Sequence, residues 1–241
     1  MSKWIEKAQP SERIAWQSDA FYNLDKKSAD QQYSLKSQRK QINYLLGLGP
    51  NSKSVIKDSG QLFLARGHLA AKGDFFYGAQ QKSTFHLVNA APQWQSFNNG
   101  NWKFLEQSIR QMATTRNLDL EIYTGTHEIL TMRNNNTESN VELFLFSSNG
   151  EVGLPVPLFF WKIVFDPKSS AGVAFVGTNN PYITSSKLDE MRICKDVSER
   201  INWISLNNKK LQRGFTYACS VMEFRKNVKF VPNLKVNNLL V

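Results

Sequence analysis

The apolar residues of this chain recur with the spacing of helices in some segments and of strands in others. From Asn98 to about residue 114, the residues Trp102, Leu105, Ile109 and Met112 follow at steps of three and four, which predicts an amphipathic helix. A second helix is predicted over residues 34–46, because Gly47 ends the pattern and the Gly49-Pro50 pair beyond it breaks helices.

Short runs rich in β-branched and aromatic residues predict the strands, at residues 62–64, 84–89, 118–123, 141–146, 160–165 and 172–176. Pro92 is expected to mark the end of the second run. A further helix is predicted over residues 188–197 and a tail over 232–241. The order strand, loop, strand, helix over residues 61–115 is a ββα arrangement. The class is therefore α+β, with a central antiparallel sheet and helices packed on it.

No linker is evident, so we expect a single domain over residues 1–241, with an irregular basic N-terminal part of about 1–60 before the ββα unit. The hydrophobic content of 41% over 241 residues is enough for a sizeable core. The apolar runs are too short to span a bilayer, so no membrane partner is expected. The first residues carry no apolar stretch typical of a signal peptide.

The net charge of +10 indicates an anionic partner, of which nucleic acid is the leading candidate. Its distribution is uneven: residues 1–60 hold 10 Lys or Arg against 6 Asp or Glu, residues 61–180 hold 9 against 9, and residues 181–241 hold 11 against 5. The basic excess thus flanks the segment with the candidate chemistry. A basic surface that only aids solubility would give the same totals.

Arg66 and His68 are two residues apart on either side of Gly67, which fits a corner that needs an unusual backbone angle or a close approach. A histidine can take a proton near neutral pH, and an arginine can hold phosphate oxygens. Each also has an ordinary structural interpretation, as a hydrogen-bonded turn histidine and a surface ion pair.

Asn98, Trp102 and Glu106 are spaced at i, i+4 and i+8, so they should lie along one stripe of the predicted helix. An amide oxygen and a carboxylate two turns apart could hold Mg²⁺, which prefers oxygen ligands and retains several waters. The ordinary interpretation makes Asn98 an N-cap, Trp102 a core residue and Glu106 a solvated residue. For Trp102 we expect the core role.

The two cysteines, Cys194 and Cys219, match no zinc-binding pattern and no redox motif. They form either one disulfide, as in an oxidising compartment, or two buried thiols.

Three blocks in order carry a resemblance to a known family. They are Ala65-Arg66-Gly67-His68, then Asn89-Ala90-Ala91-Pro92-Gln93, then Phe97-Asn98-Asn99-Gly100-Asn101-Trp102 with Leu105-Glu106. Together they resemble the signature of the DNA/RNA non-specific endonucleases, the ββα-metal or DRGH-type nucleases to which endonuclease G is related. Segments such as Trp161-Lys162-Ile163-Val164 resemble the secreted arthropod branch, and the likeness covers most of residues 60–225.

The resemblance implies a role for each matching residue. His68 corresponds to the general base, Asn98 to the direct protein ligand of Mg²⁺, and Glu106 to the carboxylate that orients the water shell of the metal. Arg66 corresponds to the phosphate-facing arginine, and Asn89 to an asparagine at the edge of the site. The family motif begins with Asp where this chain has Ala65. No residue within 1–60 can be matched to a further basic residue of the family.

We therefore expect an Mg²⁺-dependent endonuclease, with Mn²⁺ as an alternative cofactor, that cleaves DNA and RNA to 5′-phosphate and 3′-hydroxyl ends. The alternatives are a catalytically silent nucleic-acid-binding protein on the same fold, supported by Ala65, and a phosphodiesterase for small nucleotides. A homodimer is one option, since relatives are often dimers. Secreted, mitochondrial and intracellular locations all fit the chain, and the arthropod resemblance favours secretion.

Overall fold

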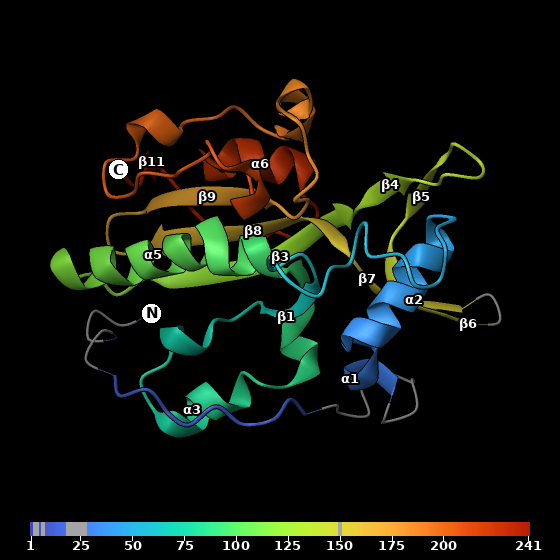
Figure 1. The fold of residues 1–241 in the computed structure, drawn as a ribbon. Helices are drawn as coiled ribbons and strands as arrows, with labels where there is room; N and C mark the ends of the chain where they lie inside the picture. The colour runs from blue at the N-terminus through green and yellow to red at the C-terminus, as the bar shows by residue number, and fades with distance from the viewer. Residues whose placement is uncertain (2–4, 6–7, 18–27, 149–150) are drawn as a thin grey trace.

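A central antiparallel sheet organises the molecule in the computed structural model, which describes residues 1, 5, 8–17, 28–148 and 151–241 (Figure 1). Its strands are β3 (Glu121–Ile129), β8 (Pro157–Asp166), β9 (Ala171–Thr178) and β10 (Thr216–Cys219), in the order β10-β9-β8-β3. The short β11 (Asn238–Leu239) joins β9 in parallel. The expected α+β class with a central antiparallel sheet is confirmed.

Both faces of this sheet are covered, which explains why β8 is apolar along almost its whole length. On one face, Phe160 and Val164 pack with the apolar residues of α5 (Lys103–Thr115). On the other face, Trp161 packs against Phe224 of α6 (Val221–Asn227), with ring centroids 5.5 Å apart. Figure 1 shows α5 and α6 on opposite sides of β8 and β9.

The expected ββα unit is present. Strand β1 (Leu64–His68) pairs antiparallel with β2 (Ala90–Trp94), and β2 leads through α4 (Gln95–Phe97) and a wide helical turn, η4 (Asn98–Trp102), into α5. The connection from β1 to β2 contains η2 (Lys72–Asp74), α3 (Gly78–Ser83) and η3 (Leu87–Asn89).

The strand predicted over residues 84–89 is wrong, because those residues form a turn and η3. The strand is instead β2, and Pro92 lies within it, opposite Arg66. Among the described residues the β1–β2 sheet has two strands, so β2 has an edge with no partner strand there, where a proline costs little.

The helix predicted over residues 34–46 is confirmed as α2 (Leu35–Leu45), preceded by the short α1 (Ser28–Gln32). The Ser34 hydroxyl caps its first turn by accepting the Ser37 N–H at 3.2 Å, and Gly47 follows with φ of +63°. Two hairpins complete this side of the molecule: β4 (Thr131–Arg133) with β5 (Asn140–Glu142), and β6 (Phe144–Ser148) with β7 (Glu151–Pro155).

The helix predicted over residues 188–197 is wrong. This part of the chain forms short 3₁₀ turns, η5 (Ser185–Lys187), η6 (Asp189–Met191) and η7 (Ser198–Arg200), with η8 (Leu211–Arg213) further on. A disulfide joins Cys194 to Cys219 of β10, and the Ile193 N–H donates to the Tyr217 hydroxyl at 2.9 Å. These links hold residues 193 and 194 against β10 through contacts that are distant in sequence and that the local pattern does not reveal.

The segment predicted as a tail, residues 232–241, ends instead in β11. In the described part of the chain, no helix has both the length and the apolar character needed to cross a membrane.

Candidate active site

Strand β1 presents Arg66 and His68 on the same side, because side chains alternate along a strand. The corner expected at Gly67 is wrong, since Arg66, Gly67 and His68 all lie within β1. The expected close approach at Gly67 is confirmed: a Cβ at this position would lie 2.4 Å from Oε1 of Gln93. Glycine therefore allows the side chain of Gln93 to lie directly against the back of β1.

Two adjoining hollows open on the side of β1 that carries His68. The polar hollow, of about 250 Å³, is lined by His68, Asn98 and Glu106 together with Ala71, Lys72, Gly73, Asn99, Lys103, Gln107 and Arg110. The aromatic hollow, of about 470 Å³, is lined by Arg13, Trp16, Tyr33, Phe63, Leu64, Ala65, Arg66, His68, Lys72, Phe85, Gln95, Asn98 and Asn99. His68 and Asn98 belong to both, so they mark the boundary between the two hollows.

The wide turn η4 explains how Asn98 and Glu106 come to share one hollow. In a regular helix, residues eight apart differ in direction by about 80°. Within η4, however, Gly100 has non-helical dihedral angles (φ −92°, ψ −124°), so the chain kinks there and the angle for a regular helix does not apply between Asn98 and Glu106. The predicted stripe is therefore wrong for Trp102, which is 1% exposed, while its expected core role is confirmed.

His68 lies between two aromatic side chains. Its ring centroid is 4.7 Å from that of Trp16 and 5.0 Å from that of Phe85, which meets it edge-on. Burial, followed by the charges of Arg13 and Lys72, lowers the pKa of His68 to about 4. Its Nε2 atom is buried and has no hydrogen-bond partner among the described residues. Near pH 7 the imidazole is thus neutral and able to accept a proton.

Glu106 shows the opposite shift. Burial raises its pKa to about 7, and Asp74 adds to the effect, while Lys162 and Arg110 oppose it. Lys162 is itself 1% exposed beneath α5, where its ammonium donates to the Thr124 hydroxyl at 2.6 Å. Positive charge from Lys162 therefore favours the ionised form of Glu106 from below the helix.

Arg66 is engaged by the helices near the N-terminus. Its guanidinium forms an ion pair with the Asp30 carboxylate at 2.5 Å and donates to the Asp30 carbonyl at 2.9 Å. It also lies over the ring of Tyr33, 4.8 Å from the centroid. Asp30 thus places a carboxylate beside Arg66 in a chain whose motif begins with Ala65 rather than Asp.

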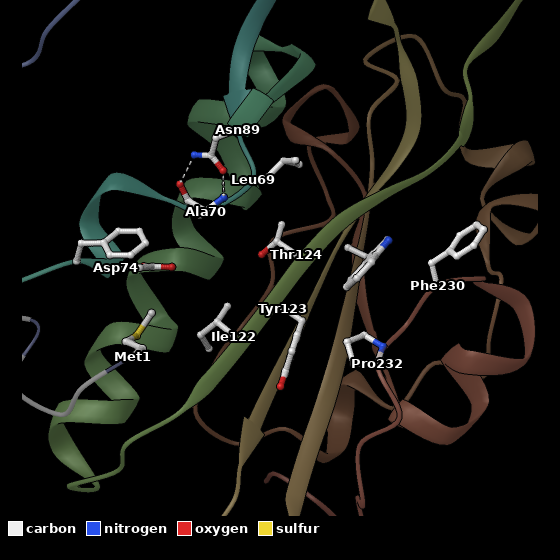
Figure 2. Close-up of a pocket in the computed structure, with 12 residues that line it drawn as sticks. Met1, Leu69, Ala70, Asp74, Asn89, Ile122, Tyr123, Thr124, Phe230 and Pro232 are labelled. Atoms are coloured by element: carbon white, nitrogen blue, oxygen red, sulfur yellow. Dashed lines mark hydrogen bonds between the residues drawn. The ribbon is translucent and has the colours of Figure 1, made fainter. Parts of the chain in front are cut away.

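Asn89 lines neither the polar nor the aromatic hollow. Its side-chain amide donates to the carbonyls of Ala70 and Thr84 at 2.9 and 3.0 Å, and its oxygen accepts the Ala70 N–H at 2.9 Å. Figure 2 shows Asn89 beside Ala70, at the wall of a separate cavity of about 650 Å³. In this arrangement Asn89 fixes the chain that follows His68.

Sequence reasoning missed three residues near His68: Arg13, Trp16 and Lys72. Residues 9–17, which we call the N-terminal strap, run past the histidine and bring the first two into the aromatic hollow. No periodic pattern marks these residues, and they are more than fifty positions from His68 in sequence. The aromatic Trp16 in a polar, aperiodic segment was the one available signal.

The side chains in the polar hollow that carry an oxygen donor for a metal ion include Asn98 and Glu106, and Asn99 and Gln107 line the same hollow. Within the described residues, no group of three or more His, Cys, Asp or Glu side chains is placed to hold a metal ion. Amide and carboxylate oxygens are ligands that Mg²⁺ accepts, with water filling its remaining positions.

Comparison with known proteins gives consistent matches. The sequence model of a family described as DNA/RNA non-specific endonuclease matches residues 2–224. The salivary endonuclease of Lutzomyia longipalpis is 34% identical over 179 residues, covering 73% of this chain and 41% of that protein. Salivary protein Tsal1 of Glossina morsitans morsitans is 29% identical over 209 residues, covering 86% and 50%. The chain thus spans half or less of the length of these relatives.

Among solved structures, a similar chain comes from the complex described as "Crystal structure of the EndoG/EndoGI complex: Mechanism of EndoG inhibition". It aligns with a TM-score of 0.37 at 23% sequence identity, over 56% of this chain and 55% of that chain.

Proposed function

The chain belongs to the DNA/RNA non-specific endonuclease family, and on that premise we propose that it hydrolyses DNA and RNA with the help of a divalent cation. The products are 5′-phosphate and 3′-hydroxyl ends. The observation that carries this proposal is the polar hollow, in which His68, Asn98 and Glu106 meet although they come from β1, η4 and α5.

His68 is the general base of the proposed reaction. A base must be unprotonated at the working pH, and the pKa of about 4 keeps the imidazole neutral. Its Nε2 atom has no hydrogen-bond partner among the described residues, so no other protein group competes for it. Trp16 and Phe85 hold the ring in place from two sides.

Asn98 and Glu106 would hold the cation, Asn98 directly and Glu106 through water. Both side chains present oxygen to a hollow with room for water, which fits Mg²⁺ or, as an alternative, Mn²⁺. When bound, the cation supplies positive charge that stabilises the leaving 3′-oxygen. It would also lower the pKa of Glu106 and hold its carboxylate ionised.

Arg66 and the neighbouring Lys72 supply positive charge for the phosphate. Both line the aromatic hollow next to His68. Since these groups address phosphate and none is directed at a base edge or a 2′-hydroxyl, we expect little distinction between DNA and RNA. Secretion is part of this proposal, because two relatives are described as salivary and the Cys194–Cys219 disulfide suits an oxidising compartment.

A catalytically silent nucleic-acid-binding protein is the second candidate. The observation that favours it is the ion pair between Asp30 and Arg66. Asp30 neutralises the guanidinium that is expected to face the phosphate. On this alternative the basic charge alone would bind the nucleic acid backbone.

Incubation of the protein with supercoiled plasmid and with a long RNA, in Mg²⁺ and in EDTA, separates the two candidates. The proposal predicts cutting of both polymers in Mg²⁺ and none in EDTA, with ends that a ligase can rejoin because they carry 5′-phosphates. Retardation of the plasmid in a gel, with no cutting in Mg²⁺ or Mn²⁺, would establish the silent binder instead.

A further inference from the structure

The proposed hydrolysis gives no role to the exposed ring surface of the aromatic hollow. Four aromatic side chains line this hollow, of which Trp16 and Phe63 are partly exposed while Tyr33 and Phe85 are buried. Three cations, Arg13, Arg66 and Lys72, line it as well, although Asp30 offsets the charge of Arg66. Ring faces beside positive charges are the features that proteins use to bind single-stranded nucleic acid, by stacking bases and attracting the backbone.

The position of this hollow relates it to the reaction centre. It shares His68 and Asn98 with the polar hollow, where the cation and the scissile phosphate are placed by the proposed function. A nucleotide whose phosphate lies at this boundary has its base within reach of the rings on the aromatic side. The charged and amide groups of the polar side offer no comparable stacking surface.

Hydrogen bonds fix the N-terminal strap to the rest of the protein on both sides of Arg13 and Trp16. Near its start, the Ser11 N–H donates to Oε1 of Gln81 at 2.7 Å, and the Lys72 ammonium donates to the Ser11 carbonyl at 2.5 Å. At its end, the Gln17 N–H donates to the Phe85 carbonyl at 2.8 Å, and the Leu87 N–H donates to the Gln17 carbonyl at 2.9 Å.

Arg13 and Trp16 lie between these anchors. These hydrogen bonds therefore hold both side chains in the wall of the hollow. Trp16 is only partly buried, which leaves ring surface available to a ligand.

We propose that the aromatic hollow receives one unpaired nucleobase next to the scissile phosphate, with Trp16 as its stacking face, so that the protein favours single-stranded over duplex nucleic acid. The inference rests on the proposed function for the position of the phosphate. A base in an intact duplex must leave its stack and its partner to enter such a hollow, which costs free energy that an unpaired base does not lose. Arg13 would contact the adjoining backbone.

The test asks whether the loss of one base from the ligand and the loss of the Trp16 ring from the protein affect the same interaction. Affinity is measured in EDTA, where cleavage does not interfere, for a short fluorescent single-stranded DNA and for the same strand with an abasic position moved along it. The wild type should bind the strand about tenfold less tightly at one abasic position, within the range for one base–aromatic stack. In Trp16→Ala this dependence should disappear, and Trp16→Phe should retain part of it.

Tyr44→Ala is the matched control, because Tyr44 is an aromatic residue of α2 that is 75% exposed and lies outside the hollow. It should behave as the wild type. A purely structural role for Trp16 would weaken the binding of every strand equally and leave the abasic effect unchanged. That result, or a wild type indifferent to the abasic position, would overturn the inference.

Cleavage then connects the hollow to the reaction. With Mg²⁺, kcat/KM of the wild type should be higher on single strands than on the matching duplex, and Trp16→Ala should reduce this ratio. Equal ratios in the two proteins would contradict the proposed preference. If no substrate is cut while the abasic effect in binding persists, the proposal of hydrolysis is wrong and the proposal that the hollow binds a base is supported.

Discussion

At the scale of single residues, burial has opposite effects on the two titratable groups of the polar hollow. It lowers the pKa of His68 to about 4 and raises that of Glu106 to about 7, because in each case it disfavours the charged form. For His68 the result is a neutral base ready at physiological pH. For Glu106 the result is a carboxylate whose ionisation costs stability until a cation compensates for it.

Glu106→Gln should therefore stabilise the metal-free protein at high pH. A raised pKa in the folded state means that the contribution of Glu106 to stability is complete below about pH 4.5 and is lost as the pH rises through about 7. The neutral amide avoids this loss, so urea unfolding in EDTA at about pH 8 should show a gain of about 1–3 kcal/mol that vanishes near pH 4.

The control for this substitution is Glu223→Gln, at a surface carboxylate paired with Lys226, which should change stability by less than about 0.5 kcal/mol. Added Mg²⁺ should stabilise the wild type more than Glu106→Gln. A loss of stability in Glu106→Gln at high pH would show that Glu106 is ionised and well paired without a cation.

At the scale of elements, the sequence predicted those with a strong local pattern. The helix α5 was found from the helical spacing of its apolar residues, and the strands β8 and β9 were found from their runs of β-branched and aromatic residues. Strand β2 was missed because it contains Pro92, and the helix predicted over residues 188–197 was wrong in a segment that is held by contacts distant in sequence, among them the Cys194–Cys219 disulfide.

The wide turn η4 could not be predicted either. Its geometry depends on Gly100 passing close to Arg213, which is far away in the sequence. The meeting of Asn98 and Glu106 was nevertheless predicted, although for a regular helix rather than for the turn that brings it about.

Gly100→Ala tests whether this turn positions the site. A Cβ at Gly100 would lie 2.5 Å from the carbonyl oxygen and 2.9 Å from the Cα of Arg213, both backbone atoms that cannot move aside. We expect a loss of about 1–3 kcal/mol in stability. Displacement of Asn98 relative to Glu106 should reduce the rate of cleavage by about 100-fold.

The matched control is Gly49→Ala, since a Cβ at Gly49 meets nothing within 4 Å. Its stability and activity should be those of the wild type. Full activity of folded Gly100→Ala would mean that η4 does not set the geometry of the hollow.

At the scale of the whole molecule, the site is assembled from distant parts of the chain. The N-terminal strap supplies Trp16, α1 supplies Asp30, and β8 supplies Lys162 beneath α5. None of these contacts follows from a local pattern, because each depends on how separate elements pack together. The motif residues could be predicted because each falls in one of three compact blocks between residues 65 and 106.

Removal of the Cys194–Cys219 disulfide should weaken the molecule as a whole. The two residues are 25 positions apart, and closing a loop of this size restricts the unfolded chain by about 3 kcal/mol. Cys194→Ser with Cys219→Ser, and the wild type under a reductant, should both unfold at lower urea concentration than the oxidised wild type. An unfolding midpoint that does not change on reduction would exclude a stabilising bond.

The most direct test of the account is single-turnover cleavage of supercoiled plasmid in Mg²⁺ by the wild type, His68→Ala and His127→Ala. His127 lies on β3 outside both hollows, so it serves as the matched histidine. We predict that His68→Ala loses at least about 10²–10⁴-fold in rate, the contribution of a general base, while His127→Ala stays within a few-fold of the wild type. Cleavage by folded His68→Ala at the wild-type rate would contradict the account.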